Sequence, residues 1–233
     1  MILAAGRGER MRPLTDQVPK PLIQIGGRSL VHRHLEGLRA AGVRDFVINL
    51  GWLGEQLREA LGDGAALGLR ISYSEEGWPA LESGGGLHHA LPLLGDQPFL
   101  VVNGDIHADY PWPRLLHRAA EMPAEILAHL VMVPNPPHNP RGDFALDEDG
   151  KVRNDSKARL TFSGISIHRP EIFAGCQPGH FPMLPLWRAA ADRGALSGEA
   201  FAGGWSDVGT PDRLDALRAG LASPSPRPLG SLT

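Results

Sequence analysis

The chain has 233 residues and a formal net charge of −3, with 42% hydrophobic and 21% charged residues. This composition is that of a globular protein with a substantial core, and it offers no broad basic surface for nucleic acid. No apolar run approaches the roughly 20 residues that span a bilayer, and glycine, arginine and glutamate begin at position 6, before a signal peptide could form. The single Cys176 can form no intrachain disulfide, so we expect a reducing compartment, the cytoplasm. From the net charge and the lack of a long apolar run we expect neither nucleic-acid nor membrane partners.

The first predicted element is a buried strand over residues 1–5, which ends in a glycine-rich, arginine-studded loop. Gly6 and Gly8 allow backbone N–H groups to approach an anion closely, and Lys20, set between two prolines, adds positive charge. The loop lacks the lysine of a Walker A motif, and Met11 stands where the dinucleotide fingerprint needs its third glycine. The pattern therefore predicts a triphosphate site of another type.

The remaining first half alternates between helices and strands. Apolar residues recur at helical spacing or form short buried runs, bounded by glycine. We predict helices over residues 30–41, 53–61 and 87–94, strands over 46–50, 69–74 and 99–103, and a turn at Gly84, Gly85 and Gly86. Strands separated by helices imply right-handed crossovers and a parallel sheet.

The second half reads as strands joined by loops rich in proline and glycine. This pattern favours an antiparallel extension that covers one side of a site. We predict strands over residues 126–133, 143–146, 151–153 and 160–168, and helices over 184–193 and 211–219, the second capped by Thr210. A single domain over 1–221 and a disordered tail over 222–233, rich in serine and proline, complete the prediction.

Two aspartates stand out in the pattern. Asp105 directly follows the strand 99–103, and ligands in open α/β sheets gather beyond the carboxyl ends of strands. Asp207 lies in the sequence Trp205-Ser206-Asp207-Val208-Gly209-Thr210. Taken alone, either residue could be an aspartate that caps a turn or a helix.

The stretch from Leu3 to Thr15, with Lys20 and Pro21 after it, resembles the nucleotidyltransferases that make nucleotide sugars from a sugar 1-phosphate and a nucleoside triphosphate. Their loop reads Gly-x-Gly-x-Arg-(Leu/Met)-x-Pro-Leu-Thr, followed by Lys-Pro. The resemblance implies an α/β, three-layer Rossmann-like fold with a mixed, mostly parallel sheet. We find no hexapeptide repeats of the C-terminal β-helix that some relatives append.

The same resemblance implies the site. Asp105 and Asp207 would hold one Mg²⁺, with Mn²⁺ possible, because Mg²⁺ takes one or two carboxylates and fills its octahedron with phosphate oxygens and water. Arg10 and Lys20 match the catalytic basic pair, facing the β/γ-phosphates and the α-phosphate respectively. The implied nucleotide contacts are Leu3, Ala4, Gly6, Arg7, Gly8, Glu82, Gly84, Gly85, Gly86 and Asn103. Arg7 and Arg12 stay open between a phosphate contact and a solvated loop charge.

The three glycines suggest how the base is read. Bare backbone lets a flat base lie against it, although a flexible turn is a serious competing interpretation. In relatives this loop selects the base, and its form here resembles that of uridine users, so we expect UTP. Trp78 and Trp205 flank the site segments and are candidates for pocket walls.

Further segments resemble one branch of the family, which acts on N-acetylmuramate α-1-phosphate in peptidoglycan recycling. They include Ile48-Asn49, Trp52-Leu53-Gly54, Tyr73-Ser74-Glu75-Glu76-Gly77 and Thr161-Phe162-Ser163-Gly164-Ile165-Ser166. By position in the family, Gly142, Asn154 and Asp155 would face the sugar, and Arg141 or Lys157 could meet its lactyl carboxylate.

Two alternatives remain. One is transfer of another nucleotide, or transfer to another sugar or to phosphocholine. The other is a non-catalytic domain that binds nucleotide sugars, against which the presence of Arg10, Lys20, Asp105 and Asp207 argues. The sequence gives no prediction of the oligomeric state.

Overall fold

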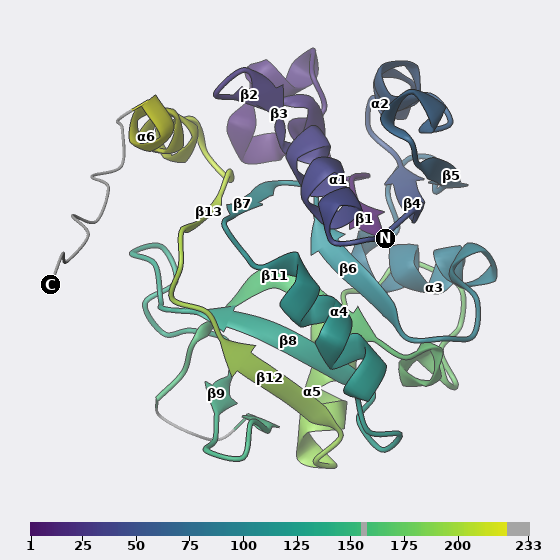
Figure 1. The fold of residues 1–233 in the computed structure, drawn as a ribbon, viewed down its shortest axis with the longest axis vertical. Coiled ribbons are helices and arrows are strands. Elements are labelled where there is room, and N and C mark those ends of the chain that lie inside the picture. Colours follow the sequence, from purple (N-terminus) through teal and green to yellow (C-terminus); the bar gives the residue numbers. More distant parts are fainter. Residues whose placement is uncertain (155–157, 223–233) are drawn as a thin grey trace, which may run out of the picture.

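The centre of the molecule is a seven-stranded sheet with the strand order β12-β8-β11-β6-β1-β4-β5, seen in a computed structural model that describes residues 1–154 and 158–222 (Figure 1). The strands are β1 (Ile2–Leu3), β4 (Asp45–Leu50), β5 (Arg70–Glu75), β6 (Phe99–Asn103), β8 (Ala128–Val133), β11 (Thr161–His168) and β12 (Leu196–Ala200). Asp155, Lys157 and positions 223–233 of the expected tail lie outside the described residues.

The sheet is mixed and mostly parallel, as predicted. Strand β1 pairs in parallel with β4 and β6, β4 with β5, and β12 with β8. Strand β11 runs antiparallel to both of its neighbours, β6 and β8. Because β1, β4 and β6 are parallel, their carboxyl ends meet at one edge, where a ligand site is expected.

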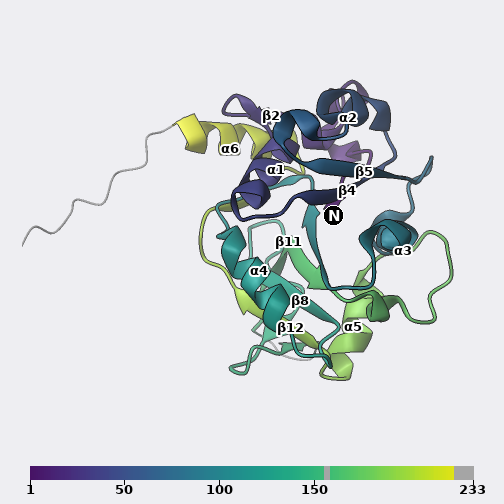
Figure 2. The ribbon, with the colours of Figure 1, turned by 45° about the vertical axis from the view of Figure 1, so that its right-hand side comes forward.

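Helices cover both faces of the sheet (Figure 2). Apolar side chains of α1 (Leu30–Ala40), α2 (Gly54–Leu61) and α4 (Trp112–Glu121) pack on one face, and those of α3 (Glu82–Leu94) and α5 (Leu184–Asp192) on the other. Neighbouring strand residues alternate between the two cores, as Val101 and Val102 do. The predicted three-layer α/β architecture is confirmed.

Smaller elements complete the structure. These are the pairs β2 (Gln24–Ile25) with β3 (Arg28–Ser29), β7 (Ile106–Ala108) with β13 (Trp205–Asp207), and β9 (Ala145–Leu146) with β10 (Val152–Arg153), together with α6 (Pro211–Ala222). Buried residues of the first loop, of β2 and of α6 form a third apolar cluster, so α6 is anchored to the N-terminal loop.

Several predicted boundaries change. Strand β1 has two residues instead of five, and Ala222, predicted as the start of the tail, is the last residue of α6. Helix α4 was not predicted, although its apolar residues Trp112, Leu115 and Leu116 recur at helical spacing on one face. Thr210 does cap α6, since its Oγ1 accepts from the Arg213 backbone N–H at 3.4 Å.

The predicted turn at the three glycines is wrong, because Gly84, Gly85 and Gly86 lie inside α3. A Cβ atom would overlap the Phe181 ring at Gly84, the Gly179 carbonyl oxygen at Gly85 and the Glu76 carboxylate at Gly86. The glycines are therefore needed for close packing in a helix rather than for a turn.

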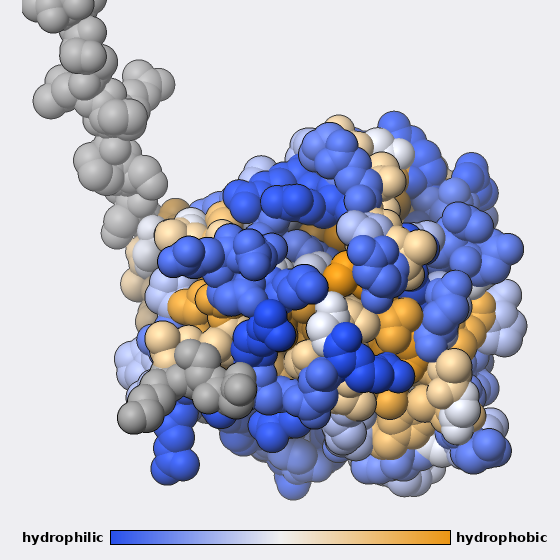
Figure 3. All heavy atoms as spheres, turned by 90° about the horizontal axis from the view of Figure 1, so that it is seen from below, coloured by the Kyte–Doolittle hydropathy of each residue, from blue (hydrophilic) through white to orange (hydrophobic). Residues whose placement is uncertain are grey.

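Hydrophilic and apolar residues share the face of the molecule in Figure 3, where apolar residues gather towards the centre and the right-hand side with hydrophilic residues among them. Large apolar side chains that are exposed among the described residues are Leu14, Trp78, Leu93, Leu184 and Leu221. None of the helices within 1–154 and 158–222 has the length and apolar character needed to cross a membrane.

Candidate active site

A cavity of about 460 Å³ lies at the carboxyl ends of β1, β4 and β6. Seven of the predicted nucleotide contacts line it, namely Leu3, Ala4, Gly6, Arg7, Gly8, Glu82 and Asn103. Lys20 and Asp105 line it as well, whereas Gly84, Gly85 and Gly86 do not. We call this space the main cavity.

The first loop is held in one conformation around Gly8. This residue has φ 70°, and a Cβ atom there would come within 3.0 Å of the Lys20 side chain. Thr15 donates its hydroxyl proton to the Gly8 carbonyl oxygen at 2.9 Å, and the Met11 N–H donates to the same oxygen at 2.8 Å. Glycine at this position therefore lets the Lys20 stem pass close to the loop and reach the cavity.

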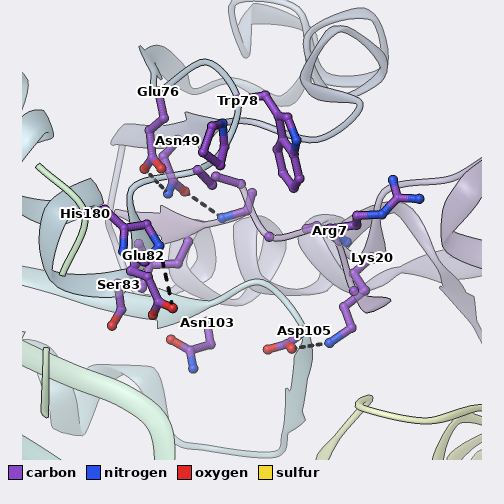
Figure 4. Close-up of a pocket in the computed structure, with 18 residues that line it drawn as sticks. Arg7, Lys20, Asn49, Glu76, Trp78, Glu82, Ser83, Asn103, Asp105 and His180 are labelled. Carbon is purple, nitrogen blue, oxygen red and sulfur yellow. Dashed lines mark hydrogen bonds and ion pairs between the residues drawn. The ribbon is translucent and has the colours of Figure 1, made fainter. Parts of the chain in front are cut away.

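The Lys20 ammonium ends beside Asp105. Its Nζ donates to Asp105 Oδ2 at 2.7 Å, and the lysine side chain is 12% exposed (Figure 4). The first loop and the end of β6 are thus joined by an ion pair in the main cavity. The Lys20 ammonium can donate to a phosphate group that enters the cavity.

Asp207 is brought to Asp105 by the pairing of β13 with β7. In this ladder Asp207 is opposite Ile106, and the Val208 N–H donates to the Asp105 carbonyl oxygen at 2.8 Å. Both aspartates line a second cavity of about 260 Å³, which also includes His138 and Trp205. The sequence indicated each aspartate, but only the ladder brings them together.

These two carboxylates fit a divalent cation. They are hard oxygen donors, Asp207 at the end of β13 and Asp105 in the turn just before its partner strand β7, and Mg²⁺ requires few protein ligands when phosphate and water complete its shell. Within 1–154 and 158–222, no group of three or more His, Cys, Asp or Glu side chains is arranged to hold a metal. The protein would therefore supply two ligands rather than a complete cage.

Asp207 also has two cationic or polar partners that the sequence analysis missed. Arg213 Nη1 lies 2.9 Å from Oδ1 and 2.8 Å from Oδ2, and His138 Nε2 lies 3.2 Å from Oδ1. Arg213 is in the first turn of α6, so a basic residue close behind an Asp-Val-Gly-Thr stretch was the signal available. His138 comes from a proline-rich loop and carries no such signal.

Two of the three arginines of the first loop, Arg7 and Arg10, behave differently from Lys20. Arg10 is exposed and does not line the main cavity, but a Cβ at Gly209 would lie 3.2 Å from its Nη2. Arg7 lies with its guanidinium 3.7 Å above the Trp52 ring and pairs with Asp16 at 2.9 Å. Figure 4 shows the Arg7 side chain directed away from the cavity that its backbone lines.

The opposite end of the main cavity is built from a hydrogen-bonded chain. The Ala4 N–H donates to Asn49 Oδ1 at 2.6 Å, and Asn49 Nδ2 donates to Glu76 Oε1 at 2.6 Å. The second Glu76 oxygen accepts from the Leu81 N–H at 2.8 Å. This chain ties β1, β4 and the start of α3 together, and neither Asn49 nor Glu76 was a predicted site residue.

Trp78 forms a wall at the same cavity. Its side chain lines the space, the residue is 55% exposed, and its ring contacts Trp52 edge-on with centroids 5.5 Å apart. Figure 4 places Glu76, Asn49, Glu82, Ser83 and His180 at one end of the cavity, with Lys20 and Asp105 at the other.

The residues predicted to face the sugar lie elsewhere. Gly142, with φ 63°, donates its N–H to the Asn139 carbonyl oxygen at 3.1 Å and lines neither cavity. Asn154 Nδ2 donates to Asp192 Oδ1 at 2.7 Å and to the Arg188 carbonyl oxygen at 3.0 Å, which ties it to α5. Asp155 falls outside the described residues.

Known proteins resemble this chain along most of its length. The family model described as nucleotidyl transferase matches residues 1–155. A protein of Neisseria meningitidis serogroup B named N-acetylmuramate alpha-1-phosphate uridylyltransferase is 50% identical over 222 residues, which cover 94% of this chain and 96% of that protein. A Caulobacter vibrioides protein of the same name is 38% identical, over 95% and 96%.

A solved structure shares the fold. It is a putative glucose-1-phosphate thymidylyltransferase from Bacillus anthracis in complex with sucrose, with a TM-score of 0.82. The match covers 94% of this chain and 92% of that one at 20% sequence identity, so it speaks for the fold alone.

Proposed function

Because this chain belongs to the nucleotidyl transferase family, we propose that it transfers the uridylyl group of UTP to a sugar 1-phosphate, preferably N-acetylmuramate α-1-phosphate. The chain is an enzyme of the sugar-phosphate nucleotidyltransferase class. The products would be a UDP-sugar and pyrophosphate, and the reaction would serve peptidoglycan recycling. The meeting of Asp105 and Asp207 beside Lys20 is the observation that carries this proposal.

The reaction needs no general base. An oxygen of the acceptor's phosphate, already anionic at neutral pH, attacks the α-phosphorus of UTP while the bond to the β-phosphate oxygen breaks and pyrophosphate leaves. Positioning and charge stabilisation can supply the catalysis. Lys20, which reaches the main cavity, would lie against the α-phosphate, and Arg10 would face the leaving phosphates.

A divalent cation fits Asp105 and Asp207, and we propose Mg²⁺, with Mn²⁺ as a substitute. When bound, it would neutralise negative charge on the phosphates. In the structure Lys20 pairs with Asp105 and Arg213 pairs with Asp207. Binding of a divalent cation to these carboxylates would therefore have to rearrange both ion pairs. UTP is a cytoplasmic metabolite, so the proposal also places the reaction in the cytoplasm.

The acceptor belongs beside Asp207 in this proposal. The second cavity lies next to the main one, because Asn103 and Asp105 line both. His138, Asn139 and Trp205 supply polar and aromatic surface there, which suits a sugar. The contacts of Gly142, Asn154 and Asp155 with the sugar, drawn from resemblance, remain predictions.

The test is a substrate panel. We would measure pyrophosphate release with Mg²⁺, combining UTP, dTTP, GTP and CTP with the 1-phosphates of N-acetylmuramate, N-acetylglucosamine and glucose. Turnover confined to UTP, and fastest with the muramate, is the expected result.

Two other outcomes have clear meanings. Turnover with a different pair would retain the reaction class and replace the substrates. Bound nucleotide without turnover on any pair would contradict the proposal and favour the non-catalytic binding domain.

A further inference from the structure

Asp207 and Arg213 form an ion pair that is partly shielded from water. The aspartate side chain is 25% exposed and the arginine 18%, and Nη1 lies within 2.9 Å of both carboxylate oxygens. The Nε atom of Arg213 is buried and has no hydrogen-bond partner among the described residues. Part of the guanidinium therefore has unused capacity to donate.

Arg213 also lies next to a second guanidinium. A Cβ on Gly209 would overlap Arg213 Nη2 and would come within 3.2 Å of Arg10 Nη2, so both groups lie over the same glycine. Two neighbouring guanidinium groups repel each other, and a nearby anion offsets this repulsion. Asp207 is the anion that contacts Arg213 in this structure.

We propose that Arg213 is a positioning residue that exchanges its counter-ion during the catalytic cycle. Before substrate binds, Arg213 holds the Asp207 carboxylate. Once a divalent cation has taken that carboxylate, Arg213 pairs with phosphate beside Arg10. This inference rests on the proposed function, because it assumes that Asp207 is a metal ligand and that phosphates enter the site.

The chemistry of the groups supports this order. The guanidinium places a positive charge against the Asp207 carboxylate, and this charge repels a second cation at the same group, so Arg213 competes with metal. The freed guanidinium leaves two adjacent positive charges, and a planar guanidinium is well suited to phosphate oxygens. Arg213 would therefore weaken metal binding in the empty enzyme and strengthen phosphate binding in the loaded one.

The test uses Arg213→Met, which retains much of the side-chain volume and removes the charge. The matched control is Arg218→Met on the same helix, where the guanidinium is partly exposed and donates to the Gln24 carbonyl oxygen at 3.2 Å. Mn²⁺ binding to the nucleotide-free protein would be measured by electron paramagnetic resonance of the free ion. Pyrophosphate binding would be measured by calorimetry at saturating Mn²⁺.

We expect Arg213→Met to bind Mn²⁺ roughly tenfold more tightly and pyrophosphate roughly tenfold more weakly, the size typical of one charged hydrogen bond. Arg218→Met should match the wild type in both measurements. Circular dichroism would verify the fold, and Arg213→Gln, which also removes the charge, would replace Arg213→Met if that variant did not fold.

Mn²⁺ affinity that is unchanged or weaker in a folded Arg213 variant would overturn the exchange. Tighter Mn²⁺ binding with unchanged pyrophosphate affinity would overturn the phosphate role. Both measurements are equilibria that need no turnover, so their result is separate from that of the substrate panel.

Discussion

Each of the two site aspartates has a basic partner in the structure, Lys20 for Asp105 and Arg213 for Asp207. A carboxylate in a partly buried place is costly without such compensation. The pairs therefore stabilise the site in the absence of substrate. They also provide the positive charge that a triphosphate needs, so the same residues serve both states.

Replacing Asp105 with asparagine tests the first of these roles. Asn preserves the shape of the side chain but removes the negative charge, so turnover should fall at least about a hundredfold, on the order of 3 kcal/mol of transition-state stabilisation. Steady-state pyrophosphate release measures the loss. Asp96→Asn, at an exposed loop position, is the control, and wild-type turnover in Asp105→Asn would remove Asp105 from the metal site.

Trp78 tests the wall of the main cavity. If the indole contacts the nucleoside, Trp78→Ala should raise the KM for UTP by about fivefold to tenfold with little change in kcat, the size of a lost aromatic contact. The residue is 55% exposed, so the fold should tolerate the change. Trp78→Phe should restore most of the affinity. A KM unchanged by Trp78→Ala would mean that the nucleotide does not reach this wall.

The polar residues of the cavity separate what the sequence could predict from what it could not. The loop that carries Lys20 predicts a phosphate site from its residues, and the family resemblance implies the metal role of Asp105. Asn49 and Glu76 stand in segments that resemble the family but carry no predicted role, and His138 stands in no such segment; each acquires its place through a partner from another element. Their role depends on the tertiary structure, which the local sequence does not show.

Helix α3 shows the same limit for a whole element. Three consecutive glycines predict a turn from propensity alone, because glycine is a poor helix former. In the structure they allow the helix to approach Glu76 and the segment around Gly179 and Phe181. Tertiary packing has overridden the local preference.

This packing predicts the effect of Gly86→Ala. Alanine favours helix by up to about 1 kcal/mol, yet at this position its Cβ would overlap the Glu76 carboxylate and disturb the bond from Asn49. We therefore expect a loss of about 1–3 kcal/mol in the free energy of unfolding. Urea denaturation would measure it.

The matched control is Gly220→Ala in α6. Apart from its chain neighbours and the backbone of its own helix, no atom of residues 1–154 and 158–222 lies within 4 Å of a Cβ built at Gly220, so alanine there should stabilise the protein by about 0.5–1 kcal/mol. Stabilisation by both substitutions would contradict the packing argument for α3.

The elements with the most buried apolar residues are the ones whose bounds are predicted most accurately. Strand β6 has the predicted bounds 99–103, and α1 differs by one residue, because both contain runs or stripes of buried apolar residues. Strands β7 and β13 have three residues each and exist through their pairing with each other. No local pattern marks them, although they determine where the two aspartates meet.

At the scale of the whole molecule, buried titratable groups set the response to acid. His34 lies between α1 and α4, 3% exposed, with its ring edge-on to Trp112 at 6.0 Å and no hydrogen-bond partner for Nε2 among the described residues. Burial lowers the pKa of His34 to about 4. Burial also lowers the pKa of His168, to about 3.

These lowered pKa values determine whether the free energy of unfolding rises or falls with pH. The ordinary pKa of histidine is 6.5, so between pH 6.5 and pH 4 the unfolded chain binds a proton at His34 that the folded chain does not. The contribution of neutral His34 to the free energy of unfolding is fully present above pH 6.5 and decreases as the pH falls towards 4. At pH 5 the loss due to His34 is about 2 kcal/mol.

His34→Gln isolates this contribution. The free energy of unfolding in urea would be measured at pH 7.5 and pH 5 for the wild type, for His34→Gln and for His117→Gln, whose imidazole is 69% exposed on α4. Glutamine does not titrate, so His34→Gln should lose about 2 kcal/mol less than the wild type over this interval, whatever its stability at pH 7.5. His117→Gln should lose as much as the wild type. An equal loss in all three proteins would mean that His34 is protonated in the folded state, and the space beside α1 would then have to accommodate a positive charge.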